Sequence, residues 1–111
     1  MATNGATRSL RVCLVAADPA IVLDDASCHM VLGSSARFVV EVTCIGGSGL
    51  ARASSPGCLR LTSPSQVPFS CSAPELVEWT FEATSAGKGL LRFDFEGADQ
   101  VQVIQFKVVV Q

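Results

Sequence analysis

Residues 78–97, EWTFEATSAGKGLLRFDFEG, decide the fold class of this chain. Apolar residues occupy every second position on both sides of SAGKG: Trp79, Phe81 and Ala83 before it, and Leu91, Phe93 and Phe95 after it. A period of two indicates β-strands with one buried face. Gly87 and Gly89 can adopt the positive φ that a tight reversal requires. We therefore predict a β-hairpin that buries its aromatic side chains on one side.

Residues 36–45, ARFVVEVTCI, form the clearest long strand outside this hairpin. Glu41 and Thr43 share one face, and apolar residues share the other: Phe38, Val40, Val42 and Cys44. Charge on one face only is typical of an antiparallel sheet that packs one side on a core and exposes the other side to water. Residues 10–16 and 58–62 have shorter runs of the same kind.

The last strand, residues 101–111, changes phase along its length. Val101 and Val103 suggest one register, whereas Ile104 and the apolar residues after it suggest the other. A β-bulge inserts one extra residue and moves the following side chains to the opposite face. We therefore predict a bulge near Val103 and Ile104.

Short segments and turns separate these strands. Asp18-Pro19 ends the first strand, because proline removes a ladder donor. AIVLDD, CHMVL and VPFSCS are interpreted as short edge segments, and GGSG at 46–49 as a loop. Residues 1–9 are expected to be a flexible tail, and residues 10–111 a single domain. About seven to nine short strands without a helical period predict an all-β, immunoglobulin-like antiparallel β-sandwich.

Composition narrows the classes of partner. The chain has 111 residues, of which 49% are hydrophobic and 16% are charged, which is typical of a globular domain. The net charge is −2 and the arginines are scattered singly, whereas nucleic-acid binding needs a concentrated basic patch. No apolar run reaches the roughly 20 residues of a membrane helix. We therefore expect neither nucleic-acid binding nor membrane insertion.

The five cysteines leave the cellular compartment open. They are Cys13, Cys28, Cys44, Cys58 and Cys71, and no pair has CxxC spacing. The N-terminus has no clear signal-peptide layout, which favours free thiols in the cytoplasm. If a leader has been removed, the protein is secreted and its cysteines can pair. In that case we expect a disulfide between Cys58 and Cys71, which flank a proline-rich turn.

No constellation of residues points to catalysis or to metal binding. The only histidine, His29, follows Cys28, and neighbours on a strand point to opposite faces. Asp24 and Asp25 lack the further oxygen ligands of a calcium site. The glycine-rich 46–49 lacks the lysine and the strand–loop–helix context of a phosphate-binding loop. The chain is therefore interpreted as a non-enzyme without cofactor or metal.

Three loops are expected to gather at one end of the sandwich: 45–51, 65–75 and 96–102. Loops on a rigid scaffold are where such folds place recognition. The candidate binding residues are Gly46, Gly47, Ser48, Gly49, Ser70, Ser72, Pro74, Gly97, Ala98 and Asp99. Trp79 is expected to anchor the core. The expected partner is another protein or a second copy, and the strand end Val108 to Val110 is interpreted as an edge for strand addition.

Three motifs follow one another in the C-terminal third: WTFEA at 79–83, AGKGLLRF at 86–93 and FKVVV at 106–110. This third of the chain is similar to bacterial-type immunoglobulin-like domains. More narrowly, the motifs resemble those of the chagasin family of cysteine-peptidase inhibitors, which has a W/F-x-F-x-A strand, an AG-x-x-x-L-x-F turn and strand, and a final F-x-V-x-V strand. The resemblance implies an immunoglobulin-like fold that inhibits papain-type proteases through three loops.

The loops of this chain differ from the inhibitory motifs of that family. Where the family has an Asn-Pro-Thr-Thr-Gly loop, residues 45–49 keep only glycine. Residues 70–74 have no glycine, and residues 97–99 have no arginine, proline or tryptophan. We therefore expect a non-catalytic protein-binding or structural module that can form part of a larger assembly, and keep a diverged inhibitor of papain-type cysteine proteases as the alternative.

Overall fold

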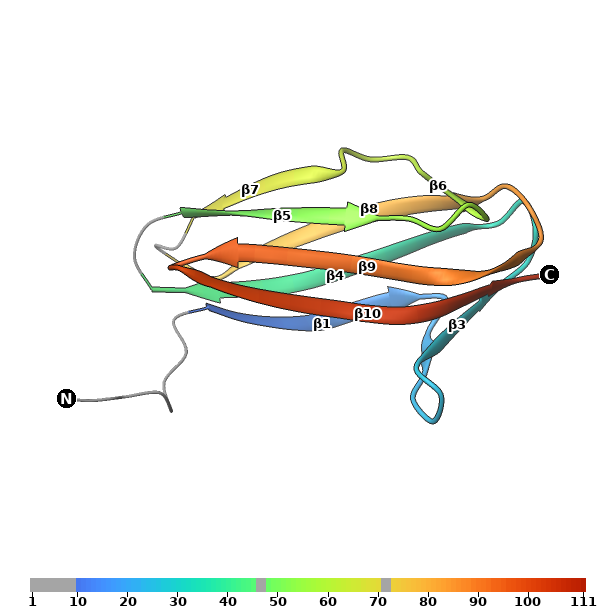
Figure 1. The fold of residues 1–111 in the computed structure, drawn as a ribbon, viewed down its shortest axis with the longest axis horizontal. Helices are drawn as coiled ribbons and strands as arrows, with labels where there is room; N and C mark the ends of the chain where they lie inside the picture. Colours follow the sequence, from blue (N-terminus) through green and yellow to red (C-terminus); the bar gives the residue numbers. More distant parts are fainter. Residues whose placement is uncertain (1–9, 46–47, 71–72) are drawn as a thin grey trace.

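Two β-sheets pack face to face in this computed structural model, which describes residues 10–45, 48–70 and 73–111 (Figure 1). The smaller sheet has the order β1 (Leu10–Asp18), β4 (Ser35–Cys44), β8 (Glu75–Ala83) and β6 (Leu59–Leu61). The larger has the order β2 (Ile21–Val22), β3 (Ser27–Met30), β10 (Gln100–Val110), β9 (Gly87–Gly97), β5 (Ser48–Ser54) and β7 (Gln66–Ser70). The all-β sandwich is confirmed, with ten strands in the described residues where about seven to nine were expected. No helix long and apolar enough to span a membrane occurs in these residues.

The predicted hairpin at 78–97 is wrong in its pairing. β8 and β9 lie in different sheets, and the connection between them passes from one layer to the other. The amide of Thr84 in this connection donates to the carbonyl of Cys58 (3.0 Å). Alternation of apolar residues is the same whether two strands pair side by side or face each other across a core. The pattern therefore identified the strands and their buried faces but not their partners.

Aromatic side chains from both layers fill the space between the sheets. The indole of Trp79 on β8 stacks on the ring of Phe93 on β9, with centroids 4.6 Å apart and planes 11° apart. The ring centroids of Phe38 on β4 and Phe106 on β10 are 5.1 Å apart. Burial of each such ring stabilises the fold by roughly 1.5–3 kcal/mol. Trp79 is fully buried, which confirms it as a core anchor, although its Nε1 has no hydrogen-bond partner among the described residues.

β10 contains no bulge, so the prediction for residues 101–111 is wrong. Its register with β9 runs unbroken from Gln100 opposite Gly97 to Val110 opposite Gly87. Val101 and Val103 are exposed on the outer face. Valine suits a pleated strand whether or not it is buried, so outward valines need no change of register. The irregularity lies instead in β1, where the register with β4 shifts between Leu14 and Ala16.

The β2–β3 segment changes the interpretation of the C-terminal strand. β1 ends at Asp18, as predicted, and a cis peptide bond joins Asp18 to Pro19. β2 then pairs with β3, and β3 pairs in parallel with β10. Val108 to Val110 therefore lie between β3 and β9, and the prediction that they form a free edge is wrong. β3, from the N-terminal part of the chain, covers this edge by pairing with Lys107–Val110.

The cysteines differ from the expectation of free thiols at one described position. Cys44 is disulfide-bonded, whereas Cys13, Cys28 and Cys58 are free. The predicted pairing of Cys58 with Cys71 is therefore wrong; Cys71 itself lies outside the described residues. Cys28 is fully buried, and this burial, with a smaller effect from Asp18, raises the pKa of its thiol to about 11. Its thiol therefore belongs to the core.

Candidate binding surface at one end of the sandwich

The predicted binding residues lie mostly at the ends of strands and not in long loops. Ser48 and Gly49 begin β5, Ser70 ends β7, and Gly97 ends β9. Ala98 and Asp99 form the turn between β9 and β10, and Pro74 directly precedes β8. Gly46, Gly47 and Ser72 lie outside the described residues. The expected loops 45–51, 65–75 and 96–102 are therefore shorter than predicted, because strands extend into each of them.

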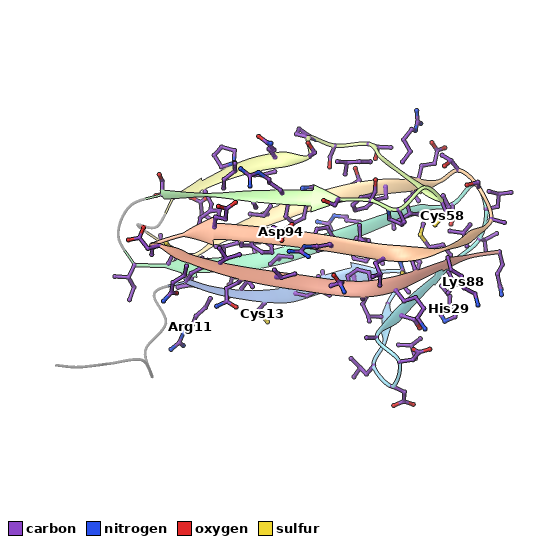
Figure 2. All side chains as sticks on the ribbon, viewed as in Figure 1. Arg11, Cys13, His29, Cys58, Lys88 and Asp94 are labelled. Atoms are coloured by element: carbon purple, nitrogen blue, oxygen red, sulfur yellow. The ribbon has the colours of Figure 1, made fainter. Side chains whose placement is uncertain are left out.

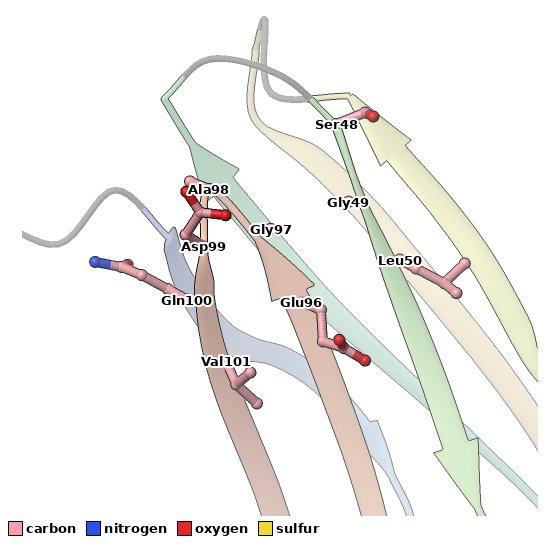
Figure 3. A pocket seen from close by; sticks show the side chains of 9 residues that line it. All are labelled: Ser48, Gly49, Leu50, Glu96, Gly97, Ala98, Asp99, Gln100 and Val101. Atoms are coloured by element: carbon pink, nitrogen blue, oxygen red, sulfur yellow. The ribbon is translucent and has the colours of Figure 1, made fainter.

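The strand register brings six of these residues to the same end. Ser48 pairs with Ser70, and Gly49 pairs with both Phe69 and Gly97. The chain turns from β9 into β10 at this end, so Ala98 and Asp99 lie beside the pair formed by Gly49 and Gly97 (Figure 3). The carboxylate of Glu75, next to Pro74, accepts a hydrogen bond from the amide of Ser70 (2.9 Å). The described parts of the three predicted segments therefore do meet at one end.

Gly49 is required by a close approach and is not itself a ligand-binding group. A Cβ at this position would lie 2.2 Å from the ring of Phe69 and 2.3 Å from the carbonyl oxygen of Glu96. A Cβ at Gly97 would lie 3.3 Å from the same ring. The Phe69 ring thus packs directly on the backbone of Gly49 and Gly97. Gly49, which the sequence suggested as part of a loop, is here part of the packed sheet.

The β9–β10 turn is built from residues that rarely adopt its conformation. Gly97 pairs with Gln100, so the turn has two central residues, and both have positive φ: 52° at Ala98 and 59° at Asp99. Turns of this kind favour Asn-Gly or Asp-Gly, because a Cβ is disfavoured in the left-handed region. Alanine has no side-chain hydrogen bond to offset that cost. Strain of this sort is often found at recognition sites.

A hollow of about 520 Å³ lies between the start of β5 and the β9–β10 turn, lined by residues 48–50 and 96–101. Two carboxylates, Glu96 and Asp99, give it negative character. Glu96 forms an exposed ion pair with Arg52 on β5, which neutralises part of that charge. The hollow can accept hydrogen bonds from a donor-rich ligand at the Asp99 carboxylate and at the Ser48 hydroxyl.

Leu50, Glu96, Gln100 and Val101 lie within the predicted loops 45–51 and 96–102 but were not among the candidate binding residues. The strand β5 was not predicted. In SGLARAS the inward residues are the small Gly49, Ala51 and Ala53. Small residues give a weak hydrophobic signal, although the period of two is present. A search for alternation of small and large residues would have found this strand.

The prediction that His29 cannot meet the Cys28 thiol is confirmed. Cys28 is buried, whereas His29 is exposed on the other face of β3, and Figure 2 shows His29 well apart from Cys13. The hydroxyl of Ser27 donates to Asp25 Oδ1 (2.5 Å) and lies 3.1 Å from His29 Nε2. This hydrogen bond lowers the pKa of the Asp25 carboxyl. The serine thus lies between the acid and the histidine, whereas a catalytic triad places the histidine in the middle.

No group of three potential ligands for a metal ion lies together in the described part of the chain. A scan against models of protein families found no match for the chain, and a search of curated proteins found none. A function for this protein therefore rests on the fold and on the geometry of the surface formed by residues 48–50 and 96–101.

Proposed function

We propose that this chain is a non-catalytic, immunoglobulin-like module that binds another protein through the end formed by residues 48–50 and 96–101. The observation that carries the proposal is the strained Ala98–Asp99 turn beside an open hollow. The strands that carry the turn and line the hollow, β5, β9 and β10, pack on the aromatic core. A rigid scaffold presents such a surface without a large entropic cost of ordering on binding.

The strand order supports the immunoglobulin-like part of the proposal. Immunoglobulin sandwiches have one sheet with strands A, B, E and D and another with strands C, F and G. The order β1-β4-β8-β6 and the order β10-β9-β5 follow the same spatial arrangement. β7 extends the second sheet beyond β5 but follows β6 in the chain, so its connection differs from that of an immunoglobulin variable domain.

The charge of the hollow indicates the kind of contact that the partner makes. Asp99 is exposed and no described cation pairs with it, whereas Glu96 already has Arg52. An exposed carboxylate steers and orients a donor-rich partner more than it adds affinity. We therefore expect the partner to place a lysine, arginine or amide side chain at Asp99.

The experiment compares three immobilised proteins as baits in an extract of the source cells. Asp99→Arg inverts the charge at the hollow, and Asp24→Arg makes the same change at the exposed β2–β3 turn, where no described residue forms a hydrogen bond or ion pair with its carboxylate. We expect one protein to be retained by the wild-type chain and by Asp24→Arg but not by Asp99→Arg. Retention of the same proteins by all three baits, or of none by the wild type, contradicts the proposal.

The alternative function, inhibition of a papain-type cysteine protease, has one observation in its favour. Three chain segments meet at one end of the sandwich, which is the arrangement that a wedge of loops requires. Titration of several papain-type proteases tests it directly. Inhibition that is weakened by Asp99→Arg but not by Asp24→Arg supports the alternative, and a flat titration removes it.

A further inference from the structure

β10 has two strand neighbours over only part of its length. It pairs with β9 from Gln100 to Val110, but with β3 only from Lys107 to Val110. On the β3 side, no described strand pairs with residues 100–106. The nearest strand there is β1, which belongs to the other sheet and meets β10 where the Leu10 amide donates to Gln100 Oε1 (2.9 Å).

The direction of the β10 backbone shows which groups this open edge presents. The amide of Lys107 donates to the carbonyl of Ala26 (2.9 Å), so it points toward the β3 side. In an extended strand, the N–H and C=O of alternate residues point to the same side. Val101, Val103 and Gln105 therefore direct their N–H and C=O groups to the open edge, and no hydrogen bond engages these groups in the described part of the chain.

An uncovered apolar strip lies beneath this edge. Phe38 on β4 contacts Phe106 on β10, so β4 lies opposite β10 across the core. β1 is the next strand beyond β4, and the position opposite β1 is filled by β3 only near Lys107–Val110. Val12 and Leu14 on β1 point inward and are only half-buried, as is Ile104 on β10. One strand is thus missing from the larger sheet over the first half of β1.

We propose that this gap between β10 and β1 binds an extended segment of a partner protein, which adds a strand beside Gln100–Phe106. Backbone donors and acceptors at strand spacing are matched only by another extended backbone. The inward side chains of the added strand pack on Val12, Leu14 and Ile104, so the segment carries apolar residues at every second position. The edge residues 100–106 carry no charge, which favours an uncharged segment.

The other sheet edges are blunted in the ways that prevent strand addition. β7 contains Pro68, β2 has two residues, and β6 has three. β1 is interrupted by its register shift at Leu14 and Ala16. Gln100–Phe106 has none of these features, although an unprotected edge of this composition favours aggregation. A partner that covers this edge would explain why Gln100–Phe106 carries no proline, bulge or charge.

A second copy of the chain is a poorer occupant than a single extended segment. If β10 of a second copy paired with this edge about a twofold axis normal to the sheet, β1 of each copy would overlap β4 of the other copy in the second layer. The proposal is independent of the loop-end site, because it depends on backbone groups of β10 and not on Asp99.

The test uses the full chain labelled with ¹⁵N and a short synthetic peptide of alternating valine and threonine with a lysine at each end. Without peptide, the amides of Val101, Val103 and Gln105 should exchange with solvent much faster than those of Lys107 and Val109. Saturating peptide should slow these three amides by about tenfold or more. The measurement requires no mutation, so it holds even if a variant fails to fold.

Two variants at Val103 test the backbone contact. Val103→Pro removes one N–H from the open edge but no bond to β9, because that N–H points away from β9. It should weaken peptide binding by about tenfold or more. Val103→Thr keeps the N–H and should bind as the wild type does, and Asp99→Arg should too, even if it abolishes the loop-end interaction.

Four results would overturn the proposal. The first is slow exchange of the three amides in the free protein, and the second is no protection by the peptide. The third is protection that appears on raising the protein concentration alone, which identifies a second copy as the occupant. The fourth is faster exchange after removal of residues 1–9, which identifies that segment as the occupant.

Discussion

The interior where β8 faces β9 and the end where β9 turns into β10 are organised by different parts of the chain. In the interior, side-chain packing sets the arrangement: Trp79 stacks on Phe93, and Trp79 and Phe95 pack edge to face with ring centroids 5.8 Å apart. At the end of the sandwich, the arrangement depends on the backbone: Gly49 pairs closely with Gly97, and Ala98 adopts positive φ. Stability is therefore concentrated in one region and a strained, open surface in the other.

The largest expected effect tests the interior. Trp79→Ala should lower the free energy of unfolding by about 3–5 kcal/mol, because it leaves a cavity against Phe93. Trp79→Phe should cost much less, since a ring remains and the indole N–H has no hydrogen bond to a described residue that could be lost. Chemical denaturation followed by circular dichroism measures both. A loss below about 1 kcal/mol for Trp79→Ala would mean that the stack contributes little.

A smaller effect tests the place where the two regions join. Gly49→Ala should destabilise the fold by about 1–3 kcal/mol, because the added Cβ overlaps the Phe69 ring and the Glu96 carbonyl. Gly57→Ala is the matched control, since nothing lies within 4 Å of a Cβ there. Thermal unfolding of the two variants should therefore differ clearly. Equal stability of the two would show that Phe69 can move away from Gly49.

The smallest effect tests the strained end, and it has the opposite sign. Ala98→Asn should raise the stability by about 0.5–1 kcal/mol, because asparagine tolerates positive φ better than alanine does. Ala20→Asn changes the same side chain at an exposed position without positive φ, and should be neutral within about 0.5 kcal/mol. Thermal unfolding measures both. If Ala98→Asn is neutral or destabilising, the turn is not strained.

The stabilising change at residue 98 also bears on function. Strained residues at recognition surfaces are often kept in spite of their cost. The three-bait experiment can therefore include Ala98→Asn as a further bait. Loss of the partner from this bait would mean that the strain serves binding, and unchanged retention would mean that it does not.

Much of the fold could be predicted from individual strands. The alternation in 36–45 identified β4 and its buried face, and Trp79 was placed in the core from its position among alternating apolar residues. β5 was missed because its inward residues are glycine and alanine. The bulge in 101–111 was predicted because outward valines were taken as buried, which the pattern of one strand cannot decide.

The candidate site could be predicted only in part. The three segments were expected to meet at one end, and their described residues do so. The hollow, the Phe69 ring over Gly49 and the positive φ at Ala98 depend on strand registers that no single segment contains. The open edge of β10 was placed at the wrong half of the strand, since the return of β3 to Lys107–Val110 is a contact between distant parts of the chain.

The sequence by itself determined that this chain forms strands, which residues on each strand are buried, and that two layers close over them. It could do so because side chains alternate along any extended strand and apolar side chains avoid water. Only the tertiary structure decided that β8 and β9 face each other instead of pairing, and along which half β10 has a described strand neighbour on one side only. Those features depend on hydrogen bonds between strands, and backbone groups are the same in every residue except proline.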